Sequence, residues 1–140
     1  MTTATSGEPN ARPPVAHAAS SPEVAVRPTV RVRPLLGVRT EQSAHGFAPE
    51  DPYVRRYWVA AIGAGAVADL LRLIRAGRDA NSVPLPRWLP ILIGADLVRV
   101  EEGDLVVPAR LPEVPLRYRR RFPPGLREQH RRAVETSRRA

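Results

Sequence analysis

Two amino acids that proteins often use for chemistry are missing from this 140-residue sequence. The absence of cysteine excludes disulfide bonds, thiolate catalysis and cysteine-based metal sites. The absence of lysine, with arginine at all 22 basic positions, leaves no residue for the lysine of a phosphate-binding P-loop. A GC-rich genome explains the choice of arginine over lysine, but it does not explain a net charge of +8. A chain this basic suggests an acidic partner, such as nucleic acid, an anionic membrane or an acidic protein.

Long hydrophobic runs are also missing. A transmembrane helix needs roughly 18 or more apolar residues in succession, and the nearest approach, residues 58–76, is interrupted by Asp69, Arg72 and Arg75. The first residues have neither the basic segment nor the apolar run of a signal peptide. We therefore expect no membrane insertion and a soluble, cytoplasmic protein.

Charge and composition divide the chain into three parts. Residues 1–48 are rich in proline, alanine and serine, and their five arginines and three glutamates sum to +2. Residues 49–113 carry eight arginines and nine acidic residues (−1), whereas residues 114–140 carry nine arginines and two glutamates (+7). This division predicts a mostly disordered leader over 1–48, a folded core over 49–113 and a basic arm over 114–140.

One stretch of the leader, residues 24–37, alternates valine with arginine at Val30 to Arg33, a pattern typical of a strand. Pro28 and Pro34 exclude a central strand, because proline cannot donate a hydrogen bond to a neighbouring strand. Three interpretations remain open. The stretch is an edge strand, an extended arm that folds on a partner, or a solvated linker.

Helical patterns dominate the first half of the core. Asp51 and Pro52 suit the N-cap and first position of a helix that runs to about Ile62. A second helix is predicted over residues 66–76, where apolar residues recur at intervals of three and four, and Gly77 is expected to end it.

A short helix and a hairpin are predicted to complete the core. The helix covers residues 87–94 and is at most two turns long unless it kinks, because Pro90 is tolerated only in the first turn. The hairpin joins residues 97–101 to residues 104–107 through a tight turn at Gly103. The sequence thus predicts a small α+β module of three helices plus a β-hairpin. A module of this size is marginal by itself, so a protein partner or homodimer would help to stabilise it.

Catalytic and metal-binding patterns are absent from the sequence. The three histidines lack partners at ligand spacing, which argues against a metal site. Three carboxylates gather at the hairpin tip, where exposure disfavours acid–base chemistry, and the two glycines between the first helices lack the rest of a phosphate-binding motif. We therefore expect no enzyme, no cofactor and no metal. The residues concerned are His17, His45, His130, Glu101, Glu102, Asp104, Gly63 and Gly65.

The strongest functional pattern lies in the basic arm, where residues 116–122 mix arginines with aromatic residues and precede a helix predicted from Gly125 to about Arg138. Arginine forms bidentate contacts with phosphate, and aromatic rings stack on exposed bases. The candidate nucleic-acid-binding residues are Arg117, Tyr118, Arg119, Arg120, Arg121, Arg127, Arg131 and Arg132. A solvated charged tail and an arm that binds an acidic protein remain as alternatives.

The order of three helices followed by Ile93-Gly-Ala-Asp-Leu-Val-Arg-Val-Glu-Glu-Gly-Asp-Leu-Val-Val107 resembles a winged-helix domain over about 60 residues. The resemblance implies a third helix in the DNA major groove and a hairpin wing on the backbone. The third helix here offers only Arg87 for reading bases, and the wing is acidic. Winged helices also serve as protein-interaction modules, for which Trp88, Ile91 and Ile93 are the candidate surface.

These observations predict a non-enzymatic accessory or regulatory protein that contacts the phosphate backbone of nucleic acid, or a nucleic-acid-containing machine, through its arginine-rich arm. The alternative is an adaptor whose apolar third helix binds a protein while the arm binds an acidic partner. The choice between DNA and RNA, the partner and the oligomeric state stay open at this point.

Overall fold

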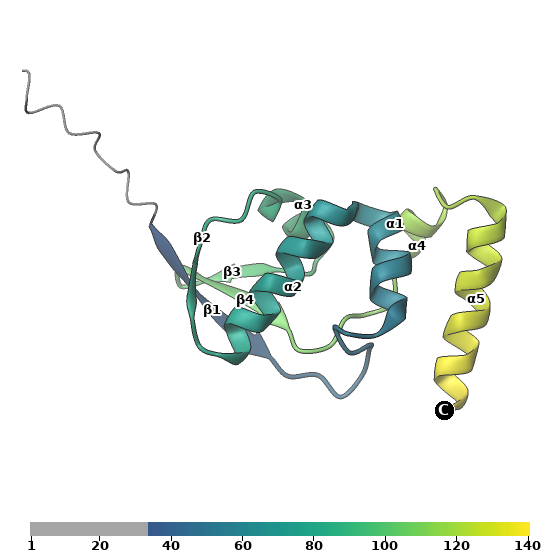
Figure 1. Ribbon diagram of the computed structural model, residues 1–140, viewed down its shortest axis with the longest axis horizontal. Coiled ribbons are helices and arrows are strands. Elements are labelled where there is room, and N and C mark those ends of the chain that lie inside the picture. Colours follow the sequence, from purple (N-terminus) through teal and green to yellow (C-terminus); the bar gives the residue numbers. More distant parts are fainter. Residues whose placement is uncertain (1–33) are drawn as a thin grey trace, which may run out of the picture. The chain divides into compact units, whose positions relative to one another are not determined.

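The computed structural model describes residues 34–140, which fold as one unit with α+β architecture, as the sequence predicts (Figure 1). The predicted disorder of the leader falls largely on residues 1–33, which lie outside the described residues. The unit is wider than the expected core of residues 49–113, because it takes in a strand before residue 49 and two helices after residue 113. In chain order its elements are β1 (Leu35–Glu41), η3 (Val54–Trp58, a π-helix), α1 (Val59–Ile62), α2 (Ala64–Arg78), β2 (Ser82–Pro84), α3 (Leu89–Gly94), β3 (Arg99–Glu101), β4 (Asp104–Pro108), α4 (Leu116–Arg119) and α5 (Pro124–Arg139).

The sheet is mixed, with the strand order β2-β1-β4-β3. β1 pairs antiparallel with β2 and parallel with β4, and β3 pairs antiparallel with β4. The argument that Pro34 excludes a central strand is therefore wrong for residues 35–37, since β1 begins directly after Pro34 and lies inside the sheet. Proline at that place limits only where the strand starts.

α2 packs across one face of the sheet, against β1 and β4. The close approach depends on Gly77, where an added Cβ would lie 2.5 Å from Thr40 Oγ1 and 3.4 Å from side-chain atoms of Val38 and Val107. This contact explains why a residue without a side chain stands at this position. α2 continues through Gly77 and ends at Arg78, whereas the sequence predicts that glycine as the stop. The glycine serves helix–sheet packing, a role that sequence periodicity does not reveal.

Gly77→Ala is expected to lower the free energy of unfolding by about 1–3 kcal/mol, because the new methyl group overpacks the helix–sheet contact. At an open helical position the same change stabilises a protein by roughly 0.4–1 kcal/mol. Gly94→Ala in α3, where nothing lies within 4 Å of the added Cβ, is the matched control. Urea unfolding followed by circular dichroism measures both. Equal stabilisation by the two substitutions would contradict the packing role of Gly77.

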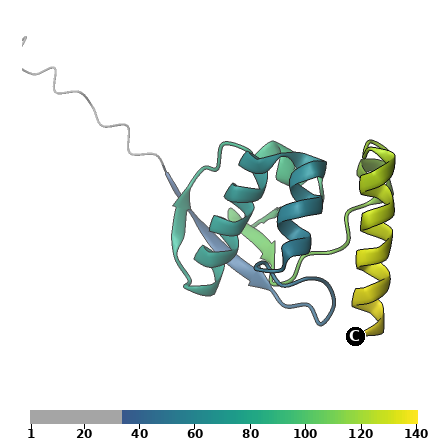
Figure 2. The ribbon, with the colours of Figure 1, turned by 45° about the vertical axis from the view of Figure 1, so that its right-hand side comes forward.

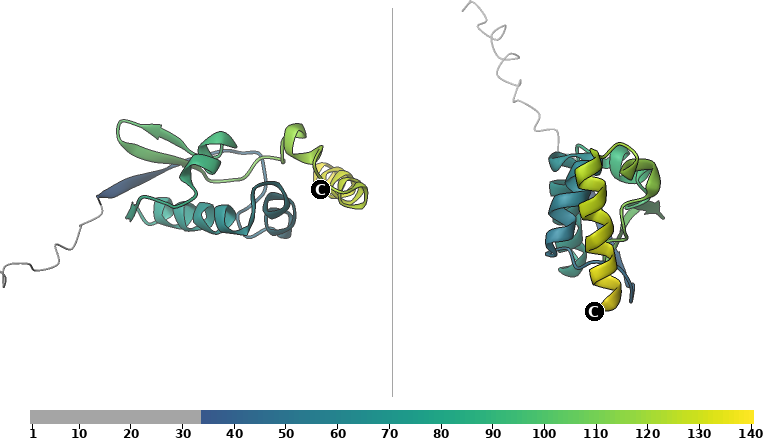
Figure 3. Two further views of the ribbon diagram at one scale, coloured as in Figure 1. Left: turned by 90° about the horizontal axis from the view of Figure 1, so that it is seen from above. Right: turned by 90° about the vertical axis from the view of Figure 1, so that its right-hand side faces the viewer.

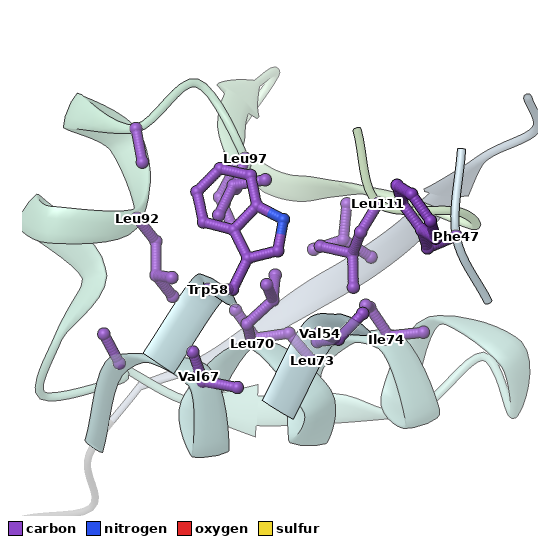
Figure 4. Close-up of a cluster of buried hydrophobic side chains, with 14 of the residues drawn as sticks. Phe47, Val54, Trp58, Val67, Leu70, Leu73, Ile74, Leu92, Leu97 and Leu111 are labelled. Carbon is purple, nitrogen blue, oxygen red and sulfur yellow. The ribbon is translucent and has the colours of Figure 1, made fainter. Parts of the chain in front are cut away.

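The core lies between the helices and the sheet and is centred on Trp58 (Figure 4). Its indole is fully buried among side chains that include Leu92 and Leu97, and its Nε1 donates a hydrogen bond of 2.9 Å to the carbonyl oxygen of Pro112. Val54 and Trp58, four residues apart, lie on the buried face of one helix, so the register of η3 fixes the indole in the core.

α5 runs beside the helix formed by η3 and α1, on the side away from α2 (Figures 2 and 3). Phe122, His130 and Val134 are buried by this contact, and Arg56 donates a hydrogen bond to the side chain of Gln129. Residues 114–140 thus belong to the folded unit. None of the helices in residues 34–140 has the length and apolar content that crossing a bilayer requires.

Candidate nucleic-acid interface

Three arginines at the turn between α4 and α5 point into solvent. Arg120 and Arg121 follow α4, and Arg127 lies in the first turns of α5. All three are exposed, and within residues 34–140 none has a carboxylate in ion-pair contact. We call Arg120, Arg121 and Arg127 the corner arginines. Their charge is uncompensated and available to an anion.

The N-terminus of α5 adds to the positive field at this corner. Helix dipoles place partial positive charge and unpaired backbone N–H groups at the first turn. α5 is 16 residues long, has no side-chain cap and has no acidic residue in its first turn. The exposed Gly125 leaves this helix end open to solvent. Backbone and side chains therefore favour an anion at the same place.

Arg117 and Tyr118 are held against the rest of the fold. Arg117 donates a hydrogen bond of 2.8 Å to the carbonyl oxygen of Gly94, lies 3.5 Å from the Asp96 carboxylate and stacks over the Tyr118 ring. Tyr118 is half-buried and faces Trp58. These two residues anchor α4 to the end of α3, so base stacking by Tyr118 would require α4 to move.

Arg119 turns inward. It is half-buried, and its Nε is one of the buried polar atoms of residues 34–140 that have no hydrogen-bond partner. Its charge acts on His130 and Tyr53, which places it at the contact between α4, α5 and the core. Arg119 is therefore set apart from the corner arginines.

Arg131 and Arg132 are exposed but paired along α5. Arg131 lies 2.6 Å from Glu128 and 2.5 Å from Glu135, and Arg132 lies 3.1 Å from Glu128. The hydrogen bond from Arg131 lowers the pKa of the Glu128 carboxyl to about 2. Such pairs at spacings of three and four residues stabilise a helix modestly. They also reduce the charge that these arginines offer to a phosphate.

The candidate protein-binding residues lie around α3. Leu89 and Leu92 are buried, whereas Ile91 and Ile93 are 38% and 42% exposed. Trp88 is half-buried, and its backbone N–H donates a 3.0 Å hydrogen bond to Asp69. The two isoleucines thus form an apolar surface, while Trp88 is largely structural.

His130 is buried where α5 meets the core, a place that its position in the basic arm does not reveal. Its Nε2 lies 2.6 Å from the Tyr53 hydroxyl, which also accepts a 2.9 Å hydrogen bond from the backbone N–H of Val114. Both hydrogen bonds of the Tyr53 hydroxyl form when it accepts from Val114 and donates to a neutral His130 imidazole. Burial, and then the nearby charge of Arg119, lowers the pKa of His130, and burial raises the pKa of Tyr53 to about 12. At neutral pH both groups are therefore uncharged.

The lowered pKa of His130 predicts acid-sensitive stability. The unfolded chain takes up a proton on this histidine as pH falls below about 6.5, while the folded chain resists it. The free energy of unfolding should therefore be highest above that pH and should fall as pH drops toward 5, by at most about 1.4 kcal/mol per pH unit for one proton. Urea unfolding at a series of pH values measures this. His130→Gln keeps a hydrogen-bond acceptor without titrating, and an unchanged pH dependence in that variant would contradict the assignment.

Four further arginines, outside the basic arm, line a small cavity or contact α5. Two are adjacent in η3 and two lie on α2, and the packing of these helices brings Arg55 to the same cavity as Arg75 and Arg78. Within residues 34–140 no group of three or more histidine and acidic residues is placed to hold a metal. The four are Arg55, Arg56, Arg75 and Arg78.

Comparison with known proteins gives no match: no family model, no curated protein and no solved structure is significantly similar to this chain.

Proposed function

We propose that this protein is a non-enzymatic accessory factor that binds the phosphate backbone of nucleic acid through the surface formed by α4 and α5. The observation that carries the proposal is the group of corner arginines, which are exposed and unpaired within the described residues, beside the uncapped N-terminus of α5. Guanidinium groups and helix N-termini both bind phosphate oxygens. Two independent sources of positive charge therefore act on one surface.

Binding of this kind is independent of sequence. Base readout in the major groove uses arginine, asparagine, glutamine and similar groups on an inserted element. α3, the candidate recognition helix, presents exposed Ile91 and Ile93, with Arg87 only at its approach. The corner arginines lie on other elements and have no such insertion geometry, so the expected contacts are to phosphates.

We also propose that the helices and hairpin form a winged-helix-like module. The order of the η3–α1 helix, α2, α3 and the antiparallel pair β3–β4 supports this proposal. β1 departs from a plain three-helix and hairpin arrangement, since it precedes the helices and pairs parallel with β4. The module then acts as a rigid support that holds α4 and α5.

The proposal is tested by titrating the full chain into short random-sequence duplex DNA and single-stranded RNA at several salt concentrations, with fluorescence anisotropy as the readout. Phosphate binding releases counterions, so log K should fall linearly with log salt concentration. Affinity should change little between unrelated sequences. Absence of binding to both nucleic acids at low salt would refute the proposed function.

A protein-interaction adaptor is the second candidate, and the exposure of Ile91 and Ile93 favours it. Exposed apolar residues on a short helix suit the core of a small protein interface. Ile91→Asp should then abolish binding to a protein partner and leave the nucleic-acid affinity unchanged.

A further inference from the structure

A small cavity of about 140 Å³ lies between α2, η3 and the segment before η3. Its charged lining consists of Arg55, Arg75, Arg78 and Glu50, and Leu71 and Ile74 contribute to its apolar lining. Three arginines and one glutamate sum to +2. Because Arg55 comes from η3 and the other two arginines come from α2, the packing of these two helices brings all three to one cavity.

One arginine of this cavity has an internal partner. Arg78 Nη1 lies 3.0 Å from Glu50 Oε1, and the hydrogen bond from Arg78 lowers the pKa of the Glu50 carboxyl. Arg55 and Arg75 are exposed, and within residues 34–140 neither has a carboxylate in ion-pair contact. Two guanidinium groups beside the cavity therefore lack an anion, while a carboxylate occupies the third.

Stabilisation of the helix end accounts for only part of this arrangement. Cations in the last turn of a helix interact favourably with its negative end, which explains Arg75 and Arg78 at the C-terminus of α2. It does not explain Arg55, which comes from η3. Like charges brought together by the fold repel one another. A bound anion reduces this repulsion.

The cavity is connected to the α5 surface through η3. Arg55 lines the cavity, and the next residue, Arg56, donates a hydrogen bond to Gln129 on α5. Gln129 and Arg132 are three residues apart on α5 and so share a face. The η3–α1 helix, which carries Arg55 and Arg56, lies between α2 and α5 (Figure 3).

We infer that the cavity lined by Arg55, Arg75 and Arg78 binds one backbone phosphate of the nucleic acid that α4 and α5 contact. The inference rests on the proposed function and extends its interface from the C-terminal helices onto the core. A phosphate oxygen accepts bidentate hydrogen bonds from guanidinium groups, and Glu50 competes with it for Arg78. Glu50 is accordingly a residue that weakens binding.

The inference is tested with two pairs of full-length variants that change the same net charge. Arg55→Gln with Arg75→Gln removes the two unpaired arginines of the cavity, and Arg39→Gln with Arg99→Gln removes two arginines that already have carboxylate partners on the sheet. Glu50→Gln removes the competing carboxylate, and Glu41→Gln removes a carboxylate on the sheet. The DNA-binding constant of each variant is measured across a salt series, and the thermal unfolding of each variant is measured as well.

The cavity pair should lose roughly 3- to 10-fold in affinity and should lower the salt slope by about one. Glu50→Gln should bind several-fold more tightly than the wild-type protein, whereas the two sheet variants should change much less. If the wild-type protein binds DNA and the cavity pair behaves like the sheet pair, the inference alone is overturned. If the wild-type protein binds no nucleic acid, the proposed function and the inference fail together.

Discussion

Replacement of Arg120, Arg121 and Arg127 by glutamine is expected to weaken nucleic-acid binding on the order of 100-fold at low salt. Each of the three arginines neutralises up to one phosphate, so the slope of log K against log salt concentration should fall by about two to three. The loss should be the same for unrelated sequences, because phosphate contacts carry no sequence information. Glutamine has a helix propensity similar to that of arginine and stays polar, so the effect chiefly reports charge.

A matched control removes the same charge elsewhere. Arg39, Arg99 and Arg110 lie on or next to the sheet, where the first two pair with carboxylates and Arg110 donates to the carbonyl oxygen of Gly46. Their replacement by glutamine should cost far less affinity. Equal losses in the two triple variants would mean that net charge alone governs binding and would contradict an interface at the α4–α5 corner.

Point variants are preferable to deletion of the C-terminal residues. A chain that ends at Pro115 would lose Phe122, His130 and Val134 from the buried core. It would also expose the Tyr53 ring, which stacks on Phe47 and touches His130. Lost binding by such a truncated chain would therefore mix unfolding with loss of charge.

Trp58→Ala should be the most destabilising single change in the core, with an expected loss of about 3–5 kcal/mol in the free energy of unfolding. The side chain is fully buried, and its removal leaves a cavity in contact with several elements. A domain of this size has a total stability of roughly 5–15 kcal/mol, so the variant should lose a large share of it and unfold at a lower urea concentration. Urea unfolding followed by far-UV circular dichroism measures the change.

Two companion variants separate the contributions of Trp58. Trp58→Phe keeps most of the apolar volume and leaves the Pro112 carbonyl oxygen without its donor, at an expected cost of about 1–3 kcal/mol. Leu85→Ala, at a position 60% exposed, should change stability by less than about 0.5 kcal/mol. A Trp58→Ala protein as stable as the Leu85→Ala protein would contradict the central place of this indole.

Local sequence signals predicted α2, the short α3 and the start of α5 to within a few residues. Their apolar spacing, proline positions and glycine turns act over one or two helical turns, so a single segment contains the information. Pro90 shows this well, since it lies in the first turn of α3, the one helical place that suits it. The α+β class followed from the same local patterns.

These local signals do not predict pairings between distant segments. β1 and β4 pair in parallel across most of the folded unit, and nothing in either strand specifies the other. The burial of His130 depends on the rings that surround it in the fold, and its position in the basic arm does not reveal it. The inward position of Arg119 and the shared cavity of Arg55 and Arg75 likewise depend on packing that local sequence patterns do not reveal.

The parallel pairing of β1 with β4 also governs when the protein can fold during synthesis. Val38 meets Leu105 in the sheet, so the central strand pair cannot form until Leu105 has left the ribosome exit tunnel. Until then β1 cannot pair with β4, whereas the helices between the two strands can form locally. Loop closure over such a span is slow compared with helix formation. Completion of the fold is therefore expected close to the time when the arginine-rich helices α4 and α5 emerge.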